Sequence, residues 1–288
     1  MHTIVLAVIC IILTSCDRTE KSTQNSSPAS SLRIISLAPS LTEWAFALNA
    51  GEQLIARTDQ CDQPAGASHL PSVGSLFPAQ IERILSYQPT DVLMIEGHEL
   101  LKEQLQRLGI RVHTLQPKKL EDMMDHAKYL GSLFSREDEA LAWINSAQRR
   151  IKKLAPLKTR VSVVIELWHS PLTVAGRESY MGDLVHTAGG RLLPTGLGDW
   201  PTLSMERLIT MNPQLLLLSS DALYSSLMED EPARPWTTLK AIKDKSVFKL
   251  EGRLSRPVPK VIDELEWLHT LFKGLTGEAP SPESHPHE

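Results

Sequence analysis

A small set of aromatic, cationic and imidazole side chains has the chemistry to hold a large flat ligand. The set consists of Phe77, His98, Trp168, His169, Trp200 and Arg256. The aromatic members offer wide, rigid faces and stand beside polar or turn-forming residues, which favours a cleft over the core as their location. The arginine can pair with a carboxylate or phosphate. The two histidines could ligate iron or cobalt, although a plain polar lining is the simpler explanation.

The elements that must position these residues alternate between strand and helix patterns. Strands are predicted at residues 33–37, 54–56, 91–95, 109–115, 160–166, 215–218 and 247–250. Helices are predicted at residues 40–48, 78–86, 99–108, 120–134, 136–154, 180–188, 204–211 and 260–275. Alternation of this kind predicts an α/β fold with parallel sheets, in which ligands bind at the carboxyl ends of the strands.

The alternation is interrupted once, in the middle of the chain. Residues 120–134 and 136–154 both have a helical pattern, and no strand lies between them. The sequence from Ser135 to Asp138 has the form of a capping box that would open the second helix, and Pro156 would end it. The interruption predicts a rigid helical connector between two α/β halves.

The two halves contain an internal repeat. Glu82-Arg83 begins a helix that is followed by Pro89 and a buried strand, and Glu206-Arg207 begins the same arrangement with Pro213 at the identical spacing. Helix, proline and strand also form a common local pattern, but the shared Glu-Arg pair favours duplication. Two similar halves predict two lobes with a cleft between them, where small ligands bind.

The N-terminus predicts export. Residues 4–13 form an apolar run that is too short to cross a bilayer and that ends in Leu13-Thr14-Ser15-Cys16. This ending resembles a bacterial lipobox, in which the cysteine is lipidated. An ordinary secretory signal or a short buried strand is the alternative, and the absence of Lys and Arg before the run departs from the pattern. In enteric-type lipoproteins, a residue such as Asp17 is associated with retention at the inner membrane.

Composition excludes several functions. The 30 basic and 34 acidic residues give a net charge of −4, which does not fit a nucleic-acid-binding protein. Nucleophile-elbow, Walker A and HExxH motifs are missing, so we expect no enzyme, catalytic residue or cofactor. The histidines are scattered and form no His-rich loop, so we name no metal-ligating residue, and a binding protein for a bare metal such as zinc or manganese stays only as an alternative. Once Cys10 is removed and Cys16 is lipidated, Cys61 has no partner for a disulfide.

Motifs throughout residues 32–275 resemble the substrate-binding proteins of ABC importers for vitamin B12 and iron-siderophores, most closely the B12-binding branch. Each motif is weak by itself, but their order and spacing are specific. They are Ile35-Ser-Leu-Ala-Pro-Ser40 with Thr42-Glu43, Asp59-Gln-Cys-Asp62 with Pro64, Val73-Gly74, Pro89, Asp91-Val92, Leu108-Gly-Ile110, Ala175-Gly176, Trp200-Pro201, Pro213 and Arg256-Pro-x-Pro259.

This resemblance implies two Rossmann-like lobes joined by a single long helix, with limited closure on the ligand. It implies that Glu82 and Glu206 dock onto arginines of a dimeric permease, although both would also suit helix N-termini without any such role. It implies an interlobe cleft for a corrinoid, or alternatively for an iron-siderophore or haem. The predicted lining is Pro39, Asp62, Leu76, Phe77, Glu96, His98, Trp168, His169, Trp200 and Arg256.

The sequence departs from the B12-binding pattern in its first half. The pattern often has tyrosine where Gln60 and Gln63 stand, and it has tryptophan near Leu76-Phe77. The aromatic clamp is therefore thinner in the first lobe, which leaves the choice of ligand open.

The resulting prediction is a monomeric, lipid-anchored periplasmic binding protein that touches the membrane only through its anchor. Its expected parts are a signal peptide at 1–15, a flexible tether at 16–31, lobes at 32–118 and 158–276, a helical connector at 119–157 and a tail at 277–288.

Overall fold

The computed structural model describes residues 32–228, 235–250, 254 and 256–278. Residues 1–31 form a unit of their own, and residues 32–288 form the second unit. The predicted signal peptide, the tether, Cys16 and most of the predicted tail therefore lie outside the described residues. No described helix is both long and apolar enough to cross a membrane.

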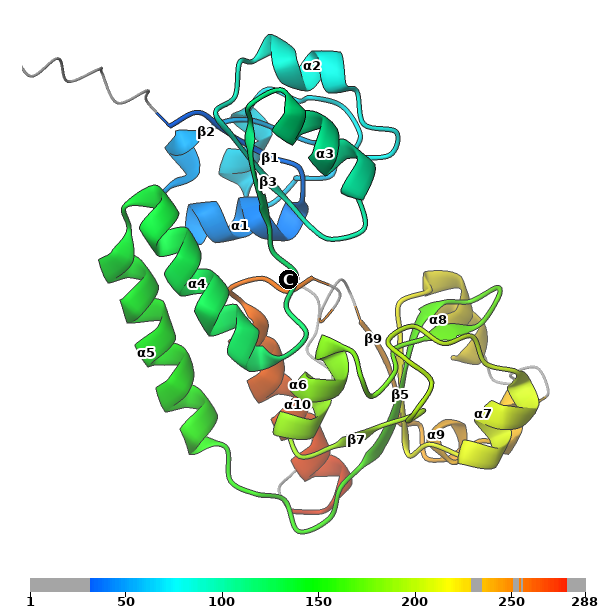
Figure 1. The fold of residues 1–288 in the computed structure, drawn as a ribbon. Coiled ribbons are helices and arrows are strands. Elements are labelled where there is room, and N and C mark those ends of the chain that lie inside the picture. Colours follow the sequence, from blue (N-terminus) through cyan, green and yellow to red (C-terminus); the bar gives the residue numbers. More distant parts are fainter. Residues whose placement is uncertain (1–31, 229–234, 251–253, 255, 279–288) are drawn as a thin grey trace, which may run out of the picture. The chain divides into compact units, whose positions relative to one another are not determined.

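The first lobe is built on a four-stranded parallel sheet (Figure 1). Its strands are β1 (Ile34–Ser36), β2 (Leu54–Arg57), β3 (Asp91–Met94) and β4 (Arg111–Thr114), in the order β2-β1-β3-β4. Its helices are α1 (Pro39–Ala47), α2 (Ile81–Ser86) and α3 (Glu99–Arg107), with short 3₁₀ helices at Gly51–Gln53 and Ala65–His69. The sheet is buried on both faces at β1 and β3, as parallel sheets are.

The second lobe has an equivalent sheet. Its strands are β5 (Ser162–Trp168), β6 (Thr173–Val174), β7 (Arg191–Leu192), β8 (Leu215–Leu218) and β9 (Val247–Lys249). The order is β6-β5-β8-β9, and β7 pairs with the start of β5; only β6 is antiparallel to its neighbour. Its helices are α6 (Tyr180–Thr187), α7 (Met205–Met211), α8 (Asp221–Leu227), α9 (Lys240–Lys243) and α10 (Val261–Leu275), with a 3₁₀ helix at Trp236–Thr238.

Two helices connect the sheets, α4 (Leu120–Phe134) and α5 (Glu137–Lys153), and they lie side by side (Figure 1). A side chain at Gly131 would place its Cβ 2.6 Å from the Cβ of Ala140, so glycine permits this close packing.

The capping box predicted at Ser135–Asp138 is wrong. Ser135 adopts a left-handed conformation (φ 54°) that ends α4, and Arg136 precedes α5 without a side-chain cap. A residue that makes this tight turn cannot have the extended backbone of an N-cap.

The repeat seen in the sequence has a structural counterpart. In each sheet the first strand of the lobe lies between two others, and a short helix with a glutamate in its first turn precedes a fully buried strand. These helices are α2, before β3, and α7, before β8. Helices that connect parallel strands run antiparallel to them, so both helices begin at the carboxyl edge of their sheet.

One hydrophobic core extends through both lobes and the connector. It includes Ile34 and Leu93 of the first sheet, Leu130 of α4, and Val163 and Leu217 of the second sheet. Since the lobes share this core, large movements of one lobe against the other would expose buried apolar surface. The core therefore favours limited closure.

Candidate functional site

A groove of about 710 Å³ lies on the first lobe between α2 and α3. Leu76, Phe77 and His98 line it, together with Glu82. The rings of Phe77 and His98 are in contact, with centroids 4.3 Å apart. Burial lowers the pKa of His98, so its imidazole is neutral at neutral pH, although Glu99 acts in the opposite direction.

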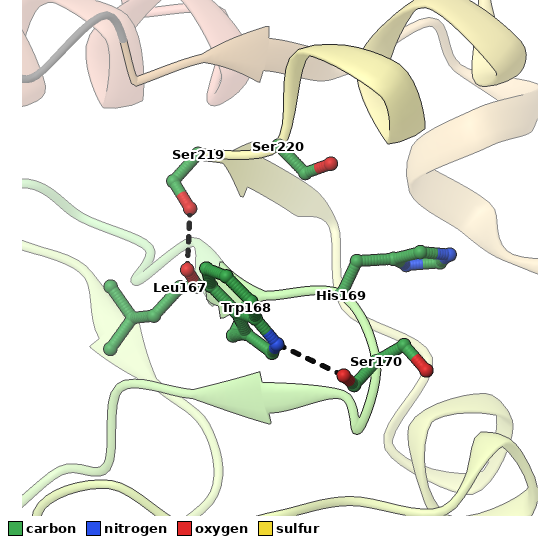
Figure 2. A pocket seen from close by; sticks show the side chains of 6 residues that line it. All are labelled: Leu167, Trp168, His169, Ser170, Ser219 and Ser220. Atoms are coloured by element: carbon green, nitrogen blue, oxygen red, sulfur yellow. Dashed lines mark hydrogen bonds between the residues drawn. The ribbon is translucent and has the colours of Figure 1, made fainter.

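The second lobe has a pocket of about 340 Å³ at the carboxyl ends of β5 and β8. Trp168, His169, Ser219 and Ser220 line this pocket. Figure 2 shows the ring of Trp168 directed toward Ser170 and the ring of His169 directed away from Trp168, while Ser219 and Ser220 lie at the end of the neighbouring strand. The indole N–H of Trp168 donates to the carbonyl of Ser170 (2.9 Å), which fixes the ring while 66% of the residue stays exposed. An exposed and fixed indole is suited to stacking on a flat ligand.

A buried carboxylate supports this second pocket from behind. Glu166, at the end of β5, is 1% exposed, and its Oε2 accepts hydrogen bonds from the backbone N–H groups of Ser219 (2.9 Å) and Ser220 (3.1 Å). The hydroxyl of Ser219 donates to the carbonyl of Leu167 (2.8 Å; Figure 2). These bonds hold the ends of β5 and β8 together beneath Trp168.

Arg256 joins the two lobes. Its guanidinium lies 3.2 Å from Asp62 and 3.6 Å from Glu43, both in the first lobe. Burial raises the pKa of Glu43, although the charge of Arg256 opposes this. The arginine side chain remains 39% exposed, so it is accessible to a ligand as well as to its two carboxylates.

Two tryptophan side chains hold the segment that carries Arg256. The indole N–H of Trp44 donates to the carbonyl of Pro257, and that of Trp143 donates to the carbonyl of Pro259, both at 3.1 Å. The two indoles also pack edge to face, with centroids 4.7 Å apart. The segment that carries Arg256 is thereby held by α1 of the first lobe and by α5 of the connector.

The other predicted cleft residues are accessible but less tightly grouped. Pro39 begins α1, Glu96 follows β3, and Trp200 is 47% exposed. None of the predicted lining residues is buried. No pocket described above includes these three, so their contact with a ligand stays a prediction.

Glu82 and Glu206 are exposed at the beginning of α2 and α7. Neither carboxylate forms an ion pair with a described residue. Hydrogen bonds from its own backbone N–H and from Ser204 lower the pKa of Glu206. Two exposed carboxylates at equivalent positions, neither in an ion pair with a described residue, suit a symmetric basic partner.

Within the described residues, no group of three or more His, Cys, Asp or Glu side chains is arranged to hold a metal ion. Cys61 is buried and reduced.

The profile of the family described as "Periplasmic binding protein" matches residues 34–254. The chain belongs to this family. It is accordingly a transport binding protein and not an enzyme. A vitamin B12-binding protein of Vibrio vulnificus (strain YJ016) is 25% identical over 254 residues, which cover 84% of this chain and 90% of the relative. A vitamin B12-binding protein of Vibrio campbellii is 29% identical over 213 residues, which cover 70% and 77%.

Solved structures of periplasmic binding proteins have the same two-lobed α/β fold. The periplasmic vitamin B12-binding protein of Vibrio cholerae has a TM-score of 0.71 at 24% identity and covers 85% of this chain and 97% of its own. The periplasmic haem-binding protein of the same organism has a TM-score of 0.72 at 21% identity and covers 84% and 99%.

Sequence reasoning missed several residues of the site. Glu43 stands in a recognised motif but carried no predicted role, and its pairing with Arg256 depends on a contact between distant segments. Ser219 and Ser220 directly follow a predicted strand, so the rule that ligands bind at strand ends would have found them.

Proposed function

We propose that this periplasmic binding protein captures a vitamin B12-like corrinoid in the cleft between its lobes and delivers it to an ABC permease. The observation that carries the proposal is the pair of unpaired glutamates, Glu82 and Glu206, at equivalent ends of two equivalently ordered sheets. A dimeric permease that offers one arginine on each half matches this arrangement.

The corrinoid assignment is supported by relatives named as vitamin B12-binding proteins, which align with most of the chain. It is supported by exposed tryptophans, because Trp168 and Trp200 offer faces that can cover a corrin ring. Arg256 would bind phosphate or amide groups on the edge of the ligand.

Haem or an iron-siderophore is the second candidate. Its support is His169, which stands exposed in the second-lobe pocket beside Trp168 and has an imidazole that could serve as an axial ligand of iron. The haem-binding protein of similar fold is consistent with this reading.

Titration calorimetry of residues 31–288 separates the candidates, because residues 32–288 form a unit of their own. Cyanocobalamin, haem and a ferric siderophore are titrated in parallel. A one-to-one complex with cyanocobalamin and sub-micromolar affinity supports the corrinoid assignment. Binding of haem or the siderophore alone would contradict it and would support the second candidate.

We propose further that Cys16 carries a lipid that anchors the protein on the periplasmic side of the inner membrane. Fractionation tests this directly. The unaltered protein should sediment with membranes, and Cys16→Ser should not incorporate labelled palmitate. Incorporation of label by the variant would exclude Cys16 as the lipidation site.

A further inference from the structure

The groove between α2 and α3 combines apolar and acidic groups. Phe77 and Leu100 line it and are 70% and 79% exposed, which makes them the most exposed of the large apolar side chains in the described chain. Exposed apolar side chains that gather in one place mark interaction sites. Contact with water does not favour the exposure of two large apolar side chains in one groove.

Phe77 is held in place although it is exposed. The backbone N–H of Phe77 donates to the hydroxyl of Ser75 (3.1 Å), and that hydroxyl donates to the carbonyl of Phe77 (3.0 Å). On the other side its ring contacts the neutral imidazole of His98. An anchor that is already ordered loses little conformational entropy when a partner binds.

The acidic charge of the groove indicates a partner with a basic side chain. Its lining includes Glu82 and Glu99 and no lysine or arginine. Lys102 lies 3.6 Å from Glu99, whereas Glu82 forms no ion pair with a described residue, so Glu82 is the carboxylate that is open to a new cation. A surface that brings an arginine to Glu82 also brings its neighbouring residues over Phe77 and Leu100.

We propose that this groove is the apolar part of the docking surface for the permease. Glu82 binds an arginine of the permease, and Phe77 and Leu100 receive an apolar side chain that lies next to that arginine. This inference rests on the proposed function and deepens it. It also assigns Phe77 to the permease, whereas the sequence predicts that this residue contacts the ligand. Apolar anchors surrounded by charged groups are the usual composition of a protein interface.

Site-specific photo-crosslinking in cells of the source bacterium tests the groove without knowledge of the ligand. A photoreactive phenylalanine analogue is introduced at position 77 or at position 100 of the full chain. The matched control is position 108, at the opposite end of α3, where Leu108 is 55% exposed and lies outside the groove. Mass spectrometry then identifies the crosslinked protein.

The expected result is a crosslink from positions 77 and 100 to the membrane-spanning subunit of an ABC permease, and none from position 108. The proposal would be overturned by a crosslink to a second copy of this chain or to another envelope protein. It would also be overturned if the crosslink yield at positions 77 and 100 did not exceed the yield at position 108.

A second measurement separates the permease from the ligand. Phe77→Ala should lower the yield of the crosslink from position 100 by at least about tenfold, because Phe77 is one of two exposed anchors. The affinity of the Phe77→Ala variant for the ligand, measured in the calorimetric titration, should equal that of the unaltered protein. A tenfold loss of ligand affinity without loss of the crosslink would place Phe77 in the ligand site and refute the inference.

The inference and the proposed function can fail separately. If Glu82→Ala with Glu206→Ala leaves uptake intact while positions 77 and 100 still crosslink to the permease, the role of the glutamates is wrong and the groove stands. If the double variant abolishes uptake and no crosslink forms, the groove is wrong and docking through the glutamates stands.

Discussion

A buried carboxylate supports the first lobe at the start of β3, on the edge of the sheet opposite the carboxyl ends of its strands. Asp91 has no exposed surface and accepts two hydrogen bonds from Arg111 (2.8 and 2.7 Å) and one from Thr90 (2.6 Å). Its Oδ1 lies 2.7 Å from the Nε2 of His113, whose Nδ1 lies 2.6 Å from the hydroxyl of Tyr129. This network connects β3 and β4 to α4.

We expect Asp91→Asn to lower the free energy of unfolding by about 3 kcal/mol, since breaking a buried ion pair costs about 3–5 kcal/mol. We take the lower end of the range because the side chain of Arg111 is 61% exposed and can regain hydration. In a chain of this size each kcal/mol shifts the melting temperature by about 2–4 °C, so the variant should melt about 6–12 °C lower.

The loss should depend on pH. Burial of Asp91 opposes its ionisation, but hydrogen bonds from Arg111, Thr90 and His113 outweigh burial and lower the pKa of the carboxyl group. Because the folded pKa is the lower one, the stabilisation is complete above the unfolded value of about 3.9 and is lost as the pH falls through the folded value. The difference between the two proteins should therefore narrow below about pH 4.

Urea denaturation followed by tryptophan fluorescence, at neutral and acidic pH, measures both effects. Arg107→Gln is the matched control, because Arg107 pairs with Glu103 on the surface, where both side chains are more than half exposed. The control should change the stability by less than about 0.5 kcal/mol. A loss below about 1 kcal/mol for Asp91→Asn at neutral pH, or a loss that stays constant in acid, would refute the reasoning.

Three further predictions concern transport, ligand binding and packing. Glu82→Ala with Glu206→Ala should abolish uptake and leave calorimetric ligand affinity unchanged; normal uptake by the double variant would contradict the docking role. Trp168→Ala should weaken ligand binding by at least about tenfold and leave the melting temperature nearly unchanged, because the indole is exposed; unchanged affinity would remove Trp168 from the site. Gly176→Ala should destabilise the protein by about 1–3 kcal/mol in thermal denaturation, because the new Cβ would overlap the carbonyl oxygen of Gly198. An unchanged melting temperature would show that this contact relaxes freely.

Hydrophobic patterning predicted every strand of the first sheet and the strands β5, β8 and β9 of the second, but it missed β6 and β7, which are only two residues long. The buried strand β8 is a continuous apolar run, β3 is apolar after Asp91, and helix α4 extends over the same residues that its periodicity predicts. Element ends were less predictable. The helix expected from residue 78 begins at Ile81, because residues 76–79 form turns and the backbone of Gln80 is extended, so helical geometry starts only after it.

The sequence predicted which types of residue are exposed at the site, but it did not predict which of these residues contact each other. Aromatic residues beside turn-forming residues proved to be exposed, as the sequence indicates for Phe77, Trp168 and Trp200. The ion pair of Arg256 with Glu43 depends on how two distant segments meet, and no local pattern encodes that. The grouping of Phe77 with Glu82 is similarly a property of the folded loop between β2 and α2.

The shared core has a consequence for how a permease could recognise this protein. Because the core and the hydrogen bonds from Trp44 and Trp143 tie the lobes together, we expect closure on a ligand to move the surface only slightly. A permease would then contact nearly the same Glu82 and Glu206 in the empty and loaded protein. Discrimination between the two states would have to come from residues near the ligand, and Arg256 is a candidate, because a ligand that competed for its guanidinium would change its contacts with Asp62 and Glu43.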